Sequence, residues 1–151
     1  MRIQVFNRKQ ILEQSKIDCA EDKVIISIST PGDNFPEFCE QNHSILDILF
    51  LSFYDIENKN EITPAARDEQ IFNDDLATQI ADFVKFWDVK NNDVNIWVHC
   101  DAGVSRSAGV AAALQKYFNG DDSKYFANDG KYFPNMLCYK KTLEKLHEIL
   151  D

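Results

Sequence analysis

Residues 94–118 read VNIWVHCDAGVSRSAGVAAALQKYF, and two different patterns meet within this stretch. The β-branched and aromatic run at 94–99 predicts a strand, whereas the alanine-rich segment that follows predicts a helix. A glycine-containing turn joins them, and this order places the first backbone N–H groups of the helix where they can bind an anion. The stretch therefore predicts an α/β unit with an anion site at its turn.

The turn combines a nucleophile with a cation, because Cys100 is followed after five intervening residues by Arg106. A neutral thiol attacks a phosphate monoester very slowly, and a helix N-terminus with a nearby guanidinium stabilises the reactive thiolate. We expect the loop amides to curl around the phosphate oxygens and the planar fork of Arg106 to bind two of them. The residues expected to bind phosphate in this way are Asp101, Ala102, Gly103, Val104, Ser105 and Arg106.

Three further residues in or beside the loop have expected roles that follow from their chemistry. Gly103 allows the backbone to approach a ligand closely and to adopt a conformation closed to larger residues. His99 is expected to orient the loop by hydrogen bonding rather than by titrating during a reaction. The hydroxyl of Ser107 can reach the sulfur of Cys100 and stabilise it as a leaving thiolate. Taken singly, a cysteine beside a strand is a small core residue, but the joint pattern favours a phosphate loop.

The flanking sequence alternates strands with helices. Strands are expected at 2–6, 23–29 and 45–53, the last of them buried, with a short helix between the first two. Apolar residues recur at helical spacing after Asn73 and again in the closing segment MLCYKKTLEKLHEIL. The polar segment IENKNEITPAARDEQIF is expected to be a surface loop. The fold class predicted is α/β: one domain over residues 1–151, with a central, mostly parallel sheet of about four to five strands flanked by helices.

The sequence HCDAGVSRS resembles the HCxxGxxRS signature of the protein tyrosine phosphatase superfamily, especially its small dual-specificity-like and bacterial-type members. The similarity extends over residues 45–118, where a helix precedes the strand that carries the nucleophile and another helix follows the signature. The segment FPNMLCYKKTLEKL also resembles the helix that closes small members. Low-molecular-weight tyrosine phosphatases and arsenate reductases carry their signature near the N-terminus, so its position here excludes them.

The resemblance implies hydrolysis of phosphomonoesters through a phosphocysteine, with Cys100 as nucleophile and with Arg106 and Ser107 in catalytic roles. It also implies an aspartic acid that protonates the leaving oxygen and later deprotonates water. Asp55 ends the run FLSFYD, where the family's acid loop leaves its strand, and is the preferred candidate. Asp68 lies thirty-two residues before Cys100, close to the spacing usual in dual-specificity phosphatases, and stays the alternative.

The formal net charge of -9 limits the classes of partner. Long-range repulsion opposes a general affinity for nucleic acid or for an anionic membrane, and no stretch resembles a membrane span or a secretory signal. We therefore expect a cytoplasmic protein. The four cysteines are dispersed without a CxxC pair, which predicts neither a zinc site nor a disulfide framework. No metal or organic cofactor is expected, because the helix terminus and Arg106 supply the positive field.

The substrate expected is a phosphorylated protein or peptide, with phosphotyrosine preferred and dual specificity open. Family members that act on polyphosphorylated inositides usually carry lysines in the loop, whereas additional phosphates would here meet the carboxylate of Asp101. Inositides and RNA 5'-phosphates are the alternative substrates. A phosphate-binding module without turnover also stays open. A rhodanese-like sulfur transferase is disfavoured by His99 and by the Arg106-Ser107 pair.

Overall fold

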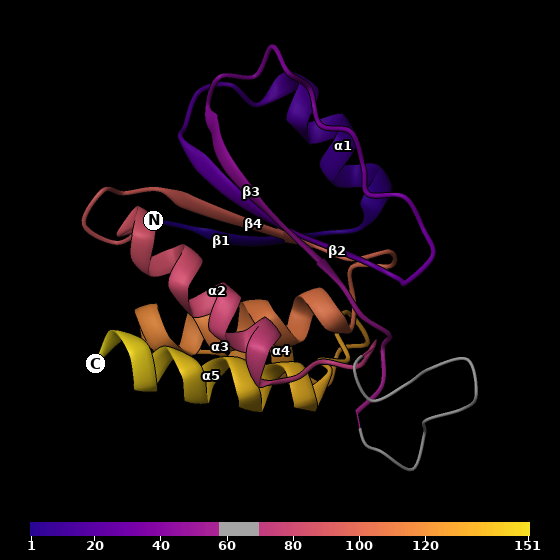
Figure 1. The fold of residues 1–151 in the computed structure, drawn as a ribbon, viewed down its shortest axis with the longest axis vertical. Coiled ribbons are helices and arrows are strands. Elements are labelled where there is room, and N and C mark those ends of the chain that lie inside the picture. The colour runs from indigo at the N-terminus through magenta and orange to yellow at the C-terminus, as the bar shows by residue number, and fades with distance from the viewer. Residues whose placement is uncertain (58–69) are drawn as a thin grey trace.

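The computed structural model describes residues 1–57 and 70–151 and has three layers (Figure 1). The middle layer is a four-stranded sheet of order β1-β4-β2-β3, in which all neighbouring strands are parallel. The α/β prediction is confirmed. The strands are β1 (Ile3–Phe6), β2 (Lys23–Ser29), β3 (Ile45–Ser52) and β4 (Asn95–His99).

Helices cover both faces of the sheet (Figure 1). Helix α1 lies on one face, and its first turn is stabilised by a capping box in which Asn7 and Gln10 each accept a backbone hydrogen bond from the other. The remaining helices lie on the opposite face. In the described part of the chain, no helix is both long and apolar enough to cross a membrane. The helices are α1 (Arg8–Ile17), α2 (Asp74–Trp87), α3 (Arg106–Asn119), α4 (Ser123–Phe126) and α5 (Met136–Leu150).

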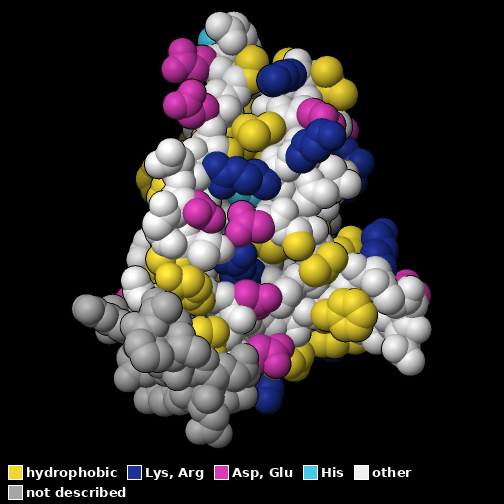
Figure 2. Space-filling model, turned by 90° about the vertical axis from the view of Figure 1, so that its right-hand side faces the viewer, with side chains coloured by type: hydrophobic (Ala, Val, Ile, Leu, Met, Phe, Trp, Pro, Cys, Tyr) yellow, Lys and Arg dark blue, Asp and Glu magenta, His cyan; other side chains and the backbone are white. Residues whose placement is uncertain are grey.

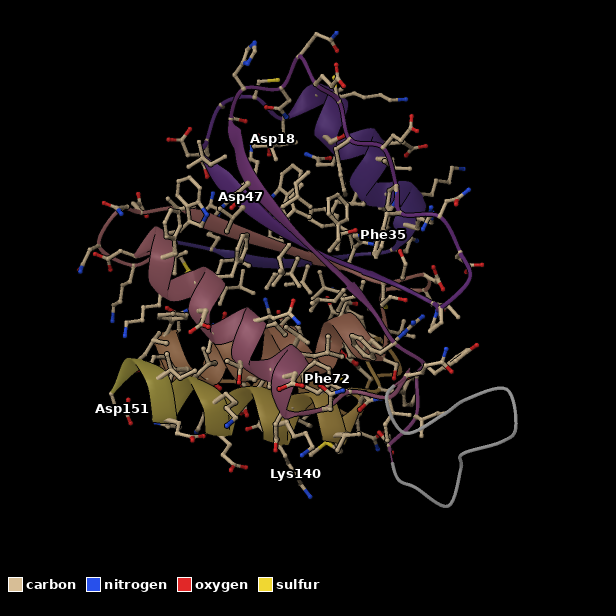
Figure 3. All side chains as sticks on the ribbon, viewed as in Figure 1. Asp18, Phe35, Asp47, Phe72, Lys140 and Asp151 are labelled. Carbon is tan, nitrogen blue, oxygen red and sulfur yellow. The ribbon has the colours of Figure 1, made fainter. Side chains whose placement is uncertain are left out.

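Side chains fill the space on both sides of the sheet (Figure 3). The larger core lies between the sheet and helices α2, α3 and α5, and at one end of it Phe72 packs edge-on against Phe53. The smaller core lies under α1 and contains Ile11, Ile25 and Trp97. Every residue of β2 and β4 is buried, as expected for the central strands of a parallel sheet that is covered on both faces.

The prediction that residues 45–53 form a buried strand is wrong in one respect. The strand is present as β3, but it lies at the edge of the sheet, and Leu51 is its one buried residue. Phe50 is 43% exposed and packs against Phe35 outside the core. The apolar composition of the segment is typical of a central strand, and the position at the edge follows from the insertion of β4 between β1 and β2.

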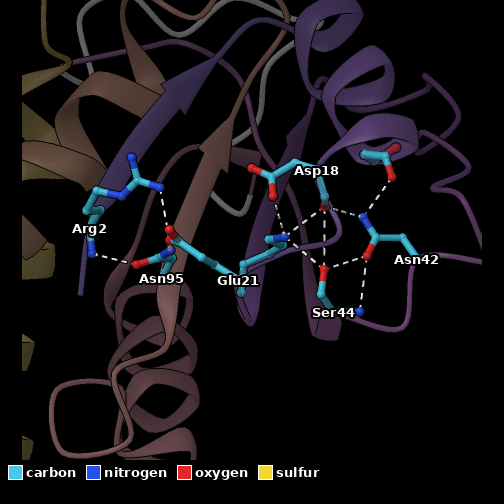
Figure 4. Close-up of polar contacts among 8 residues, drawn as sticks. Arg2, Asp18, Glu21, Asn42, Ser44 and Asn95 are labelled. Atoms are coloured by element: carbon cyan, nitrogen blue, oxygen red, sulfur yellow. Dashed lines mark hydrogen bonds and ion pairs between the residues drawn. The ribbon is translucent and has the colours of Figure 1, made fainter.

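A buried polar network joins α1 to the amino ends of β2 and β3 (Figure 4). The ammonium of Lys23 is fully buried, donates to the backbone oxygen of Asp18 and to Ser44 Oγ, each at 2.8 Å, and lies 4.8 Å from the centroid of the Trp97 ring. Asn42 donates to the same Asp18 oxygen at 2.7 Å. Because a buried charge is costly without such partners, the network fixes this end of the sheet.

At the carboxyl ends of the strands, the chain leaves two neighbouring strands toward opposite faces of the sheet. Strand β1 leads into α1, while β4 leads into α3 on the other side (Figure 1). In open α/β sheets, ligands bind outside the carboxyl ends of the strands at such a switch point. The loop between β4 and α3 lies in this position, where the Arg8 amide donates to the Asp101 backbone oxygen at 3.3 Å.

Gly103 holds the loop close to the connection between β1 and α1. Its φ is +73°, and a Cβ there would lie 2.7 Å from Asn7 N and 2.8 Å from Phe6 C. We expect Gly103→Ala to lower the free energy of unfolding by about 2–4 kcal/mol, because backbone strain adds to the displacement of this connection. Chemical denaturation measures the loss.

Gly130→Ala is the matched control, since Gly130 has a φ of +77° but nothing within 4 Å of an added Cβ. We expect that variant to lose about 1 kcal/mol, from backbone strain alone. Equal losses in the two variants would contradict the role of close approach at Gly103.

Candidate active site

The side chain of Cys100 lies inside the loop between β4 and α3. The residue is 2% exposed, and its Sγ lies 3.1 Å from Ser107 Oγ and 3.3 Å from the Gly103 nitrogen, which donates to it. One loop amide therefore points at the sulfur. The directions of the remaining loop amides, and the role of Ser107 toward a leaving thiolate, stay predictions.

The guanidinium of Arg106 is buried and joins three segments. Its Nη1 donates to Phe53 O at 2.8 Å and to Thr30 Oγ1 at 3.1 Å, and its Nη2 donates to Asp101 Oδ2 at 3.1 Å. Both Nη1 hydrogens and one Nη2 hydrogen are thus engaged. Over the described residues, Nε–H and the second Nη2–H have no acceptor, so the geometry leaves two donors for an anion.

Asp101 belongs to this arrangement through its side chain as well as its backbone. Its Oδ2 accepts from Thr30 Oγ1 at 2.9 Å in addition to Arg106. Partial burial raises the pKa of Asp101, but the hydrogen bonds from Thr30 and Arg106 outweigh it and hold that pKa below its usual range. The carboxylate is therefore ionised at neutral pH and partly offsets the positive charge of Arg106.

His99 lies beneath the loop and is fully buried. Its Nδ1 lies 3.2 Å from the Cys100 backbone oxygen, and its Nε2 lies 2.6 Å from Ser27 Oγ. Burial lowers the pKa of His99 to about 4, so the ring is neutral at physiological pH. Since a carbonyl oxygen only accepts, we assign the proton to Nδ1, and Nε2 then accepts from the Ser27 hydroxyl. This geometry suits the orienting role expected for His99.

Asp55 follows β3 and lies against the loop. Its Oδ1 accepts from Ser105 Oγ at 2.8 Å and from Asn135 Nδ2 at 2.9 Å. Ser105 directly precedes Arg106, so the structure brings this aspartate to the loop between β4 and α3. Its role as general acid stays a prediction. Asp68, the alternative candidate, lies outside the described residues.

Three residues that contact the site were not predicted from the sequence. Thr30 follows β2, Ser27 lies within it, and Asn135 precedes α5. A signal existed for Thr30, because a polar residue directly after a central parallel strand lies at the edge where ligands bind. The contacts of Ser27 and Asn135 depend on the packing of distant segments.

Charged residues of both signs contact the loop or belong to it. Figure 2 shows one side of the molecule, on which Lys and Arg side chains alternate with Asp and Glu side chains. Arg8 contacts the loop through its backbone amide, Asp55 accepts a hydrogen bond from Ser105 of the loop, and Asp101 belongs to the loop itself. Among the described residues, no group of three or more His, Cys, Asp or Glu side chains is arranged to hold a metal ion.

Solved structures share this architecture. Human DUSP28 matches with a TM-score of 0.62 and 11% identity, over 98% of this chain and 93% of that chain. PTPMT1 in complex with PI(5)P matches with a TM-score of 0.55 and 16% identity, over 99% of this chain and 92% of that chain. The chain has the fold of the tyrosine and dual-specificity phosphatases. The resemblance proposed from HCDAGVSRS is thereby confirmed for the fold.

A third protein with this phosphatase fold is the human tyrosine phosphatase-like serine/threonine/tyrosine-interacting protein. It matches with a TM-score of 0.55 and 18% identity, over 96% of this chain and 87% of that chain. No family model matches the sequence, and no curated protein matches it. The structural similarity shows the dual-specificity phosphatase fold, and identities this low leave the activity to the chemistry of the site.

The buried imidazole makes stability depend on pH. The unfolded chain takes up a proton at His99 near pH 6.5, whereas the folded chain does so near pH 4, so stability falls as the pH falls through this window. We expect His99 to contribute roughly 3 kcal/mol to this fall. Urea denaturation at both ends of the window should show a smaller pH difference for His99→Asn than for wild type. His43→Asn, at an exposed position, is the control, and an unchanged pH difference in His99→Asn would contradict the assignment.

Proposed function

We propose that this chain hydrolyses phosphomonoesters through a phosphocysteine intermediate. The observation that carries the proposal is the placement of Cys100 Sγ between the Ser107 hydroxyl and the Gly103 amide, at the N-terminus of the helix that begins with Arg106. The two Arg106 N–H groups that have no acceptor among the described residues match two oxygens of a phosphoryl group. The phosphatase fold supports the same reaction.

The first step transfers the phosphoryl group to sulfur. The thiolate of Cys100 attacks phosphorus and forms an S–P bond, while the bond from phosphorus to the leaving oxygen breaks. The electron pair of that bond goes to the leaving oxygen, which takes a proton from the carboxyl group of Asp55. Arg106 and the loop amides stabilise the negative charge on the equatorial oxygens.

The second step regenerates the enzyme. Water attacks phosphorus and gives a proton to the Asp55 carboxylate, while the S–P bond breaks and its electron pair returns to sulfur. The Ser107 hydroxyl, 3.1 Å from Sγ, stabilises the thiolate that leaves. Inorganic phosphate is released, and Cys100 and Asp55 regain their starting protonation states.

The substrate class that the site favours is a phosphorylated protein or peptide, with phosphotyrosine first and phosphoserine or phosphothreonine possible. The carboxylate of Asp101 is held beside Arg106 and disfavours additional phosphate groups on the substrate. PTPMT1, which shares the fold, was solved in complex with PI(5)P, so an inositide is the alternative to test. A free phosphorylated partner bound without turnover is the other alternative.

Removal of the thiol tests the reaction. We expect Cys100→Ser to lower kcat on para-nitrophenyl phosphate about a thousandfold or more, because the hydroxyl is a far weaker nucleophile. Vanadate should inhibit the wild type by occupying the loop. Cys19→Ser, which removes an exposed thiol, is the matched control and should retain wild-type kcat.

Two outcomes would contradict the proposal. Wild-type turnover in Cys100→Ser would exclude the phosphocysteine. Absence of turnover in the wild type, together with binding of a phosphotyrosine peptide measured by calorimetry, would identify a phosphate-binding module.

Asp101→Asn tests the substrate class. The asparagine oxygen still accepts from Thr30 and Arg106, so the variant removes the charge and retains the acceptor. We expect the ratio of kcat/KM for an inositide phosphate to that for a phosphotyrosine peptide to rise about fivefold, as one like charge is removed. An unchanged ratio would contradict selection by Asp101.

A further inference from the structure

Asn135 is a fully buried asparagine at the junction between α5 and the loop. Its backbone nitrogen donates to Ser105 O at 3.0 Å, and its Oδ1 accepts from the Cys138 nitrogen at 3.0 Å, which caps α5. Its Nδ2 donates to Asp55 Oδ1 at 2.9 Å. One side chain therefore connects the start of α5 to the segment after β3, beside the phosphate loop.

The orientation of the Asn135 amide is fixed by its surroundings. The Cys138 backbone N–H only donates, so the atom that faces it must be the oxygen. The amide nitrogen must then face Asp55 and the Ile56 backbone oxygen, which lies 3.4 Å away. Because a buried amide with these partners cannot rotate without losing them, the native packing favours the orientation in which Asn135 donates to Asp55.

Ser105 supplies a second donor to the same carboxylate oxygen. Its hydroxyl makes no cap hydrogen bond within α3, although it occupies the N-cap position, and donates to Asp55 Oδ1 instead. Two donors on Oδ1 concentrate the negative charge of the carboxylate on that atom. Over the described residues no donor reaches Oδ2, so Oδ2 is the oxygen that carries the proton of the neutral acid.

We propose that Asn135, assisted by Ser105, is a positioning residue for the general acid: it holds Asp55 by Oδ1 so that Oδ2 delivers the proton. This inference rests on the function proposed for the site. Asn135 is fully buried and acts through Asp55. Its loss should therefore matter most where the leaving oxygen most needs a proton.

The test compares two aryl phosphates by kcat/KM, which reports on the first phosphoryl transfer. The para-nitrophenolate of para-nitrophenyl phosphate leaves readily without a proton, whereas the phenolate of phenyl phosphate requires one. We expect Asn135→Ser to lower kcat/KM about tenfold more on phenyl phosphate than on para-nitrophenyl phosphate. Serine retains a cap for α5 but cannot donate an amide hydrogen to Asp55.

Asn73→Ser is the matched control. Asn73 caps α2 by accepting from the Leu76 nitrogen, so the same exchange is made at a helix cap outside the site. For Asn73→Ser, the ratio of kcat/KM on phenyl phosphate to kcat/KM on para-nitrophenyl phosphate should equal that of the wild type. Ser105→Ala is the second variant, which leaves the caps of both helices unchanged and should shift the ratio in the same direction as Asn135→Ser.

A double-mutant cycle completes the test. In an Asp55→Ala background, Asn135→Ser should not change the ratio further, because the group it positions is absent. Equal losses on the two substrates, or an additive effect in the Asp55→Ala background, would overturn the positioning role while leaving the proposed reaction intact. If the wild type turned over neither substrate, both the proposed reaction and the positioning role of Asn135 would be overturned.

Discussion

The buried guanidinium of Arg106 is the constraint on which the site depends. A buried cation is costly unless its N–H groups are satisfied, and its acceptors come from three separate segments. Phe53 O lies after β3, Thr30 Oγ1 after β2, and Asp101 Oδ2 within the loop after β4. The requirement to satisfy one side chain therefore fixes the carboxyl ends of these strands relative to one another.

The same contacts set the position of Asp55 relative to Arg106. The segment after β3 supplies Phe53 O to Arg106 and, two residues later, the carboxylate of Asp55 to Ser105. Two nearby residues of the segment after β3, Phe53 and Asp55, thus contact the adjacent residues Arg106 and Ser105 at the start of α3. A shift of the segment after β3 would disturb the proposed anion site and the proposed acid together, so the two halves of the proposed chemistry share one geometric determinant.

Local patterns in the sequence predicted most of the elements, and the strand order accounts for most of the rest. The run at 94–118 predicted β4, the loop and α3, because the pattern of each element depends only on residues close together in the sequence. The edge position of β3 depends on where β4 inserts, which no local pattern encodes. Likewise, Thr30 lies 76 residues from Arg106, and Asn135 lies 80 residues from Asp55. Contacts of that range become visible only after the sheet order is known.

The placement of charge bears on the phosphate site that we propose for this acidic protein. The carboxylate of Asp101 offsets the positive charge of Arg106. The net charge of this pair therefore contributes little to the attraction of an anion. In the proposed site the attraction comes from directed groups: the Arg106 N–H groups that have no acceptor among the described residues, and the Gly103 amide, which points at Cys100 Sγ. Such dipolar groups act at contact distance, where the formal charge of -9 over the whole chain has little influence. In the function we propose, recognition depends on the geometry of one phosphoryl group, and this favours monophosphorylated substrates over polyanions.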